Sequence, residues 1–202
     1  MLDTGRLLAD AAGGDRAALE RLLAAYLPQL QGFVHARLGP GLEPRESSVD
    51  VVQSVCRQVL ATRALTDFDG EEHFRAWLFT CALNKVREKA RFHRLAKRDI
   101  GREAPRAEED PLSSVAHLFT PSREAVGKET AAALGAALAA LSEEHREVIT
   151  LARIAELRHA AIAEVMGRSE PAVRQLLARA LLRLTEELRA RGVELAGGRG
   201  GS

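Results

Sequence analysis

Residues 158–180 have the sequence RHAAIAEVMGRSEPAVRQLLARA, which carries the strongest local structural signal in the chain. Two helices that cross at a tight turn need a small residue at the crossing, a turn residue that tolerates a positive φ, and a branched apolar residue that seats the second helix. Ala163, Gly167 and Val173 meet these three needs. Ser169 is placed to cap the second helix. The stretch therefore predicts a helix-turn-helix.

The second of these helices has an apolar face and a polar face. At helical spacing its apolar residues are Val173, Leu177, Ala180 and Leu184. The cap and the opposite face hold Ser169, Glu170, Arg174, Gln175 and Arg179. Burial of the apolar face turns the polar one outward, where it fits the major groove of DNA, so we expect these five residues to bind DNA. An ordinary helical hairpin with solvated arginines is the alternative interpretation.

The composition favours helices along the whole chain. Among 202 residues there are 35 alanines and 29 leucines, and aromatic residues make up 4%. Alanine and leucine favour helices whereas aromatic residues favour strands, so we expect an all-α protein. Charges interrupt the apolar stretches before the roughly 20 residues that a membrane span needs, and Asp3, Arg6 and Asp10 do not fit a signal peptide. We expect a cytoplasmic protein with no membrane insertion.

Side chains typical of catalysis or metal binding do not cluster in the sequence. Cys56 and Cys81 lack a CxxC or Cys/His spacing, so we expect two buried thiols and neither a disulfide nor a metal site. We find no nucleophile–base pair and no phosphate-binding loop. The sequence therefore predicts no catalytic residues, no cofactor and no enzyme.

Charge divides the chain into segments. Residues 75–102 carry nine basic groups and two acidic ones, a local net charge of +7. The next stretch is acidic and contains three prolines, which is typical of a linker. We expect a first domain over 1–102, a linker over 103–125, a helix-turn-helix domain over 126–192 and a flexible glycine-rich tail over 193–202.

Helical spacing and capping residues predict several helices. Asp15 caps the first, which Pro28 restarts or bends and which ends over residues 39–44. Another helix starts at Ser47 or Ser48, and a loop over 67–70 precedes a long helix that opens at His73. In the second domain we expect helices over 131–141 and 142–154, the latter capped by Ser142. The helix after Ser48 turns three polar residues outward, namely Asp50, Gln53 and Arg57.

Three further motifs accompany the helix-turn-helix. Residues 50–55, DVVQSV, resemble an Asp-Leu-Val-Gln-Glu-Val segment, and residues 74–78, FRAWL, with Asn84 further along, resemble a Trp-Leu helix. Residues 141–149, LSEEHREVI, are similar to a Leu-Pro-x-x-x-Arg-x-Val-x stretch. In this order and with an acidic linker between them, the motifs resemble those of the extracytoplasmic-function (ECF) type sigma factors of bacterial RNA polymerase. The resemblance implies two small helical domains, similar to sigma regions 2 and 4.

The resemblance also implies roles for individual residues. In the family, the face that corresponds to Asp50, Gln53 and Arg57 docks on the clamp of core RNA polymerase. The Trp-Leu helix and the loop before it bind the promoter element near the start site as it melts, which makes Phe68, Asp69 and Asn84 expected DNA contacts. The expected phosphate contacts are Lys85, Arg87, Arg91 and Arg94. Trp77 is expected in the core, and the second helix of the helix-turn-helix is expected to bind the farther promoter element as duplex.

The sequence departs from the family at a few positions. Leu176, Leu181 and Leu182 stand where the family often has basic residues, and Ala161 stands where it often has Glu. We therefore expect a less basic DNA-binding helix, and Leu182, if exposed, faces the polymerase flap or an inhibitor.

We expect a sigma factor that directs core polymerase to promoter DNA and assists melting. Two alternatives stay open: a stand-alone dimeric regulator that binds a palindrome, and a helical adaptor that does not bind DNA. Whether an anti-sigma factor binds the chain is left open as well.

Overall fold

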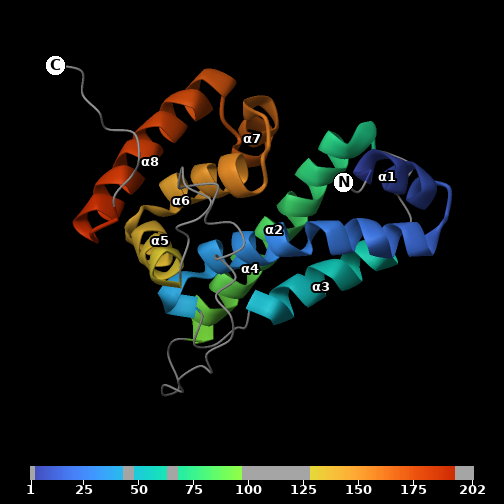
Figure 1. The fold of residues 1–202 in the computed structure, drawn as a ribbon, viewed down its shortest axis with the longest axis horizontal. Coiled ribbons are helices and arrows are strands. Elements are labelled where there is room, and N and C mark those ends of the chain that lie inside the picture. The colour runs from blue at the N-terminus through green and yellow to red at the C-terminus, as the bar shows by residue number, and fades with distance from the viewer. Residues whose placement is uncertain (1–2, 43–47, 63–67, 97–127, 194–202) are drawn as a thin grey trace.

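The computed structural model describes residues 3–42, 48–62, 68–96 and 128–193, and every regular element in these ranges is helical (Figure 1). The elements are α1 (Thr4–Ala12), α2 (Arg16–Leu42), α3 (Ser48–Ala61), α4 (Gly70–Ala96), α5 (Lys128–Ala140), α6 (Glu143–Ile149), the π-helical turn η3 (Thr150–Ile154), α7 (His159–Met166) and α8 (Glu170–Ala190). The expected all-α fold is confirmed. None of these helices is both long and apolar enough to cross a membrane. The expected linker over 103–125 and residues 194–202 lie outside the described residues.

The N-terminal bundle, by which we mean α1–α4, is built around α2 and α4. Each of these two helices has 27 residues, which corresponds to about 40 Å of helix. The largest buried side chains between them are Leu22, Leu30, Phe33, Phe74, Phe79 and Leu83. The rings of Phe33 and Phe79 meet edge to face at 5.2 Å, an arrangement that aromatic rings prefer. Helix α3 buries four valines, Val51, Val52, Val55 and Val59, so its polar face is turned outward.

The helix that carries Pro28 is one continuous element. Asp15 caps it as predicted, because its carboxylate accepts the N–H groups of Ala17 and Ala18 at 2.9 and 3.1 Å. The helix ends at Leu42, within the predicted 39–44 range, but Pro28 does not restart it. Core packing on both sides of the proline offsets the hydrogen bond that its ring removes. Helix α1 was not predicted from the sequence; Asp3 caps it by accepting the N–H of Arg6 at 3.0 Å.

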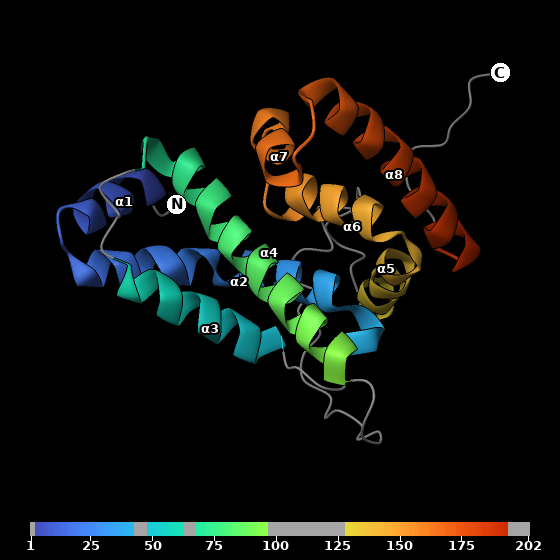
Figure 2. The same cartoon turned by 180° about the vertical axis from the view of Figure 1, so that it is seen from behind.

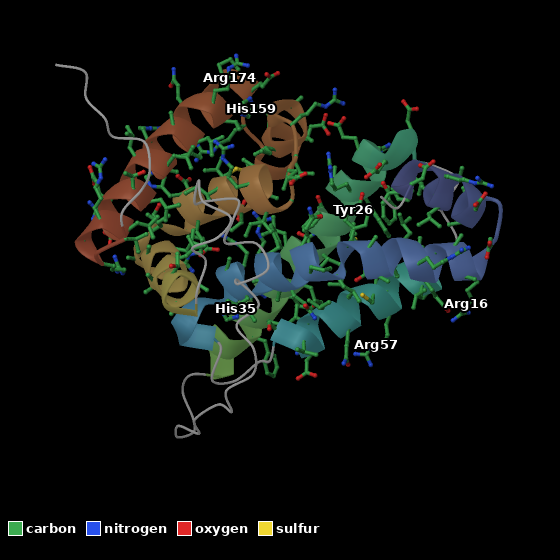
Figure 3. The ribbon with its side chains drawn as sticks, in the orientation of Figure 1. Arg16, Tyr26, His35, Arg57, His159 and Arg174 are labelled. Atoms are coloured by element: carbon green, nitrogen blue, oxygen red, sulfur yellow. The ribbon has the colours of Figure 1, made fainter. Side chains whose placement is uncertain are left out.

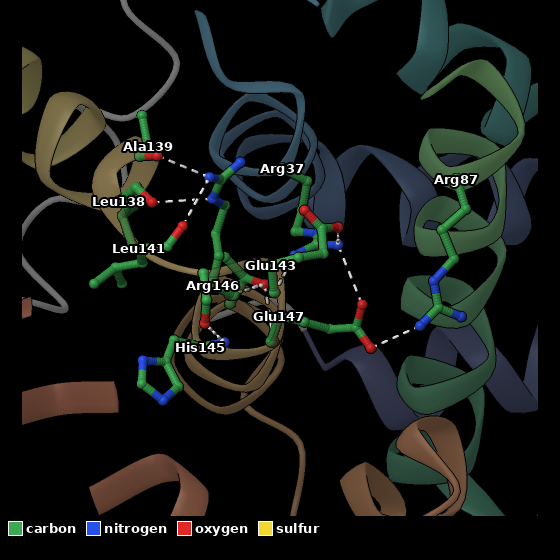
Figure 4. Close-up of polar contacts among 11 residues, drawn as sticks. Arg37, Arg87, Leu138, Ala139, Leu141, Glu143, His145, Arg146 and Glu147 are labelled. Carbon is green, nitrogen blue, oxygen red and sulfur yellow. Dashed lines mark hydrogen bonds and ion pairs between the residues drawn. The ribbon is translucent and has the colours of Figure 1, made fainter. Parts of the chain in front are cut away.

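The C-terminal bundle, by which we mean α5–α8 with η3, buries apolar side chains from each of its helices. Ser142 caps α6 as predicted, accepting the N–H of His145 at 3.3 Å. The helix expected over 142–154 is not uniform, because it widens into the π turn η3 after Ile149. Arg146 joins α6 to the end of α5: its guanidinium donates to the carbonyls of Leu138 and Ala139 at 2.9 Å (Figure 4). Burial lowers the pKa of Arg146 from its ordinary value.

The two bundles lie directly against each other. Helix α2 contacts α5, α6 and η3, and its C-terminal end lies beside α5 in both views (Figures 1 and 2). The buried residues of the two bundles form one continuous apolar cluster. The chain is therefore closed in this structure, with the C-terminal bundle covering part of the N-terminal one.

Candidate nucleic-acid interface

The turn of the helix-turn-helix has the predicted geometry. Gly167 adopts φ 61° and ψ 40°, the left-handed conformation that glycine reaches at little cost. The N–H of Arg168 donates to the carbonyl of Ala163 at 2.9 Å and closes the end of α7. Ser169 caps α8 by accepting the N–H of Ala172 at 3.4 Å. Val173 is fully buried and fixes α8 against the bundle.

The two faces of α8 divide as the sequence predicted. Val173, Leu177, Ala180 and Leu184 are buried, and Ser169, Glu170, Arg174, Gln175 and Arg179 are exposed. Arg174 lies at the outer edge of the C-terminal bundle, pointing away from it (Figure 3), and pairs with Glu170 one turn earlier. The helix therefore exposes two arginines, a glutamine and a glutamate on one face, which is a side-chain set suited to base edges and phosphates.

The leucines that stand in place of basic residues have different environments. Leu176 is buried in the C-terminal bundle, so it belongs to the core and not to the face that would bind DNA. Leu182 is 66% exposed, so it lies outside the core. An exposed Leu182 is available to a protein partner.

Two of the basic side chains predicted to contact phosphates, Lys85 and Arg87, pair with carboxylates. Lys85 pairs with Glu88 at 2.9 Å, and Arg87 pairs with Glu147 of α6 at 2.7 Å. Arg91 is exposed, whereas the side chain of Arg94 and residues 97–102 lie outside what the structure describes. Of the predicted phosphate contacts, Lys85, Arg87 and Arg91 have described side chains on α4, and Arg87 is held by Glu147 of the C-terminal bundle.

The turn before α4 forms an aromatic cluster with the helix. Phe68 is half-buried, with its ring centre 5.4 Å from that of Phe74 and 5.0 Å from that of Trp77. Trp77 was expected in the core; it is partly buried and packs against the core. The side chains of Asp69 and Asn84 are exposed. Phe68 can therefore offer a ring edge to a base, while Asp69 and Asn84 are free to accept or donate hydrogen bonds.

The polar face of α3 is presented as predicted. Asp50, Gln53 and Arg57 are all exposed and, at i, i+3 and i+7, lie on one side of the helix. Figure 3 shows Arg57 pointing away from the bundle. This face is available to a protein partner.

Sequence reasoning missed a group of ion pairs between the bundles. Arg37 of α2 has a fully buried side chain that pairs with Glu143 and, at 3.1 Å, with Glu147 (Figure 4). Glu147 is also almost fully buried, and it accepts from Arg87 as well. The available signal was an arginine within an apolar stretch, between Ala36 and Leu38, but its partners lie 106 and 110 residues away in the sequence.

A second group of polar contacts lies near the start of α4. Arg75 approaches Glu156 at 3.8 Å, and Glu72 pairs with Arg158 just before α7. Tyr26 donates to Glu71 at 2.8 Å. Burial first, and then this hydrogen bond, raise the pKa of Tyr26 well above its ordinary value. Within the described residues, no group of His, Cys, Asp and Glu could hold a metal ion.

Comparisons with known proteins agree with this geometry. The family model described as Sigma-70, region 4 matches residues 131–184, which include the helix-turn-helix. RNA polymerase sigma factor CnrH of Cupriavidus metallidurans is 33% identical over 191 residues, covering 93% of this chain and 96% of CnrH. ECF RNA polymerase sigma factor SigD of Mycobacterium tuberculosis is 30% identical over 187 residues, covering 92% of this chain and 84% of SigD.

Two solved structures are similar to the whole fold. The structure of CnrH in complex with the cytosolic domain of CnrY has a TM-score of 0.58 and 30% identity, covering 93% of this chain and 99% of that one. The co-crystal structure of the sigma factor RpoE with the anti-sigma factor NepR from Bartonella quintana has a TM-score of 0.59 at 20% identity, covering 84% and 96%, and supports the fold. By its relatives, its matching region and its helix-turn-helix, this chain belongs to the ECF type of RNA polymerase sigma factors.

Proposed function

We propose that this sigma factor acts in the cytoplasm, where it binds core RNA polymerase, directs it to promoters and assists their melting. The observation that carries the proposal is the exposed polar face of α8, which holds Arg174, Gln175 and Arg179. The buried Val173 fixes this helix against its bundle. A helix held in this way can enter a major groove without deforming its own bundle. This helix binds the farther promoter element as duplex.

The N-terminal bundle supplies two further contacts, one with polymerase and one with melted DNA. The face of α3 formed by Asp50, Gln53 and Arg57 docks on the polymerase clamp. In the C-terminal bundle, Leu182 of α8 faces the flap or an inhibitor. Helix α4 and the turn before it bind the element that melts, with Phe68, Asp69 and Asn84 at bases and the basic residues Lys85, Arg87, Arg91 and Arg94 at phosphates. Bound polymerase holds the two DNA-binding parts together, so two weak contacts act at a high effective concentration.

A protein partner of the kind found with CnrH fits the same proposal. The CnrH structure is a complex with the cytosolic domain of CnrY, and this chain matches CnrH over nearly its whole length. We therefore propose that this chain, too, binds a partner protein of the anti-sigma type.

In vitro transcription tests the proposal. Core polymerase, with and without this chain, is incubated with a library of promoter sequences, and the RNA 5′ ends are sequenced. We expect start sites that depend on the chain and share two sequence elements at a fixed spacing. A variant with Arg174, Gln175 and Arg179 changed to alanine should lose the farther element and keep polymerase binding. Failure of the chain to bind core enzyme or to select starts would overturn the proposal, and a stable free dimer on a palindrome would favour a stand-alone regulator.

A further inference from the structure

We infer that Glu147 acts as an internal substitute for a DNA phosphate: it closes the two bundles on each other, occupies Arg87, and is displaced by DNA. The inference rests on the proposed function. Glu147 belongs to α6, and its two carboxylate oxygens accept from Arg37 of α2 at 3.1 Å and from Arg87 of α4 at 2.7 Å (Figure 4). One side chain therefore joins the C-terminal bundle to both long helices of the N-terminal bundle.

The charges at this contact are poorly suited to a permanent interface. The side chain of Arg37 is 0% exposed and that of Glu147 is 7% exposed. Removing such charges from water costs free energy, and the attraction between them compensates for only part of this cost. An apolar contact of the same size often stabilises an interface equally well or better. The Nε of Arg37 adds to this cost, because it is buried with no hydrogen-bond partner among the described residues. Separation of the bundles returns all of these groups to water, which favours a contact that can open.

Glu147 lies at the middle of the α4 face proposed to bind DNA. Asn84, Arg87 and Arg91 are exposed and, at i, i+3 and i+7, share one face of the helix. Carboxylate and phosphate oxygens both accept paired hydrogen bonds from a guanidinium, so Glu147 and a phosphate compete for Arg87. The side chain of Arg87 remains 46% exposed, which leaves it accessible to such a competitor.

The other end of α4 is held by a second contact. Glu72 pairs with Arg158, and Arg75 approaches Glu156 at 3.8 Å. Glu156 has φ 52°, a conformation that side-chain-bearing residues adopt rarely and at some cost. The C-terminal bundle thus contacts α4 at residues 72, 75 and 87, so DNA that binds along this helix competes with these contacts and favours separation of the bundles.

The Glu147→Gln variant tests the inference, because it keeps the shape of the side chain and removes its charge. Glu186→Gln is the matched control: it changes the net charge equally, but Glu186 pairs with Arg183 within α8 at 2.9 Å. Small-angle X-ray scattering of the wild type and the control should give a radius of gyration of about 17 Å, the value for a compact chain of 202 residues. Glu147→Gln should give a larger radius.

DNA binding gives the second readout, with a fluorescein-labelled single-stranded 20-mer of random sequence as the probe. Glu147→Gln should bind it at least about threefold more tightly than Glu186→Gln. The plot of log K against log salt should be steeper by about 0.7, the contribution of one released arginine. Adding Arg87→Ala to Glu147→Gln should abolish both gains.

Equal radii and equal affinities for the two glutamine variants would overturn the inference. If circular dichroism shows that Glu147→Gln does not fold, hydrogen exchange of the wild-type chain provides the test. Saturating 20-mer should then increase exchange in peptides over 35–42 and 143–149. Unchanged exchange would overturn the inference. Neither assay contains polymerase. A failed transcription assay with these results intact would therefore reject the proposed function while leaving the closing contact established.

Discussion

Replacing Val173 by alanine should destabilise the protein by about 2 kcal/mol, because this side chain is 0% exposed and seats α8. Loss of two buried methyl groups costs about 1.6 kcal/mol at roughly 0.8 kcal/mol each. A residual cavity of about 45 Å³ adds about 1 kcal/mol, and the better helix propensity of alanine returns about 0.5 kcal/mol. For a chain of this size, the sum corresponds to a fall in melting temperature of about 4–8 °C.

The neighbouring residue is the control. Arg174 is exposed and pairs with Glu170 on its own helix, so Arg174→Ala should change the free energy of unfolding by less than about 0.5 kcal/mol. Urea unfolding followed by circular dichroism measures both variants, and a gel shift of polymerase holoenzyme on promoter DNA measures binding. Arg174→Ala should weaken promoter binding at full stability. If Arg174→Ala loses as much stability as Val173→Ala, or if Val173→Ala loses none, the assignment of buried and exposed faces on α8 is wrong.

Three further changes probe other parts of the molecule. Gly167→Ala should cost about 1 kcal/mol of stability in urea unfolding, all of it backbone strain at φ 61°, because an added Cβ would meet no atom within 4 Å. Arg91→Glu should weaken promoter opening, followed by permanganate footprinting, more than polymerase binding in a pull-down; equal losses would contradict the separation of roles. The raised pKa of Tyr26 means that neutral Tyr26 contributes its full stability below the ordinary tyrosine pKa of about 10 and loses it as pH rises through its higher folded pKa. Tyr26→Phe should therefore make the alkaline fall in unfolding free energy shallower, and an identical slope would refute this.

The helix-turn-helix could be predicted from the sequence because its determinants are local. Ser169, Gly167 and Val173 each act within one or two turns of their own position, through a cap, a left-handed turn and a seat for α8. The polar face of α8 then follows from the helical period alone. The capping roles of Asp15 and Ser142 were predictable for the same reason.

The parts that sequence reasoning missed depend on contacts between distant segments. Pro28 marks a break in local terms, yet packing along both sides keeps α2 continuous. Arg87 has the sequence signature of a phosphate contact, and nothing near it in the chain indicates that Glu147, 60 residues later, takes its guanidinium. The partners of Arg37, Glu143 and Glu147, lie even farther away in the sequence, at 106 and 110 residues. Pairing across two bundles is set by tertiary packing, which the helical period does not encode.

In the closed arrangement one of the two proposed DNA-binding surfaces is free and the other is partly engaged by the C-terminal bundle. This difference indicates an order of binding events. The polar face of α8 is exposed as the structure stands, so duplex can reach Arg174, Gln175 and Arg179 without rearrangement. On the α4 face, Arg87 is already paired with Glu147 although its side chain is 46% exposed, so a phosphate must displace Glu147 to gain this arginine. Any partner that binds the separated form more tightly shifts the chain toward it, and by reciprocity a separated chain binds that partner better. Polymerase that holds the bundles apart would therefore expose the surface for melted DNA at the moment a promoter is bound, and a partner that favours the closed form would withhold it.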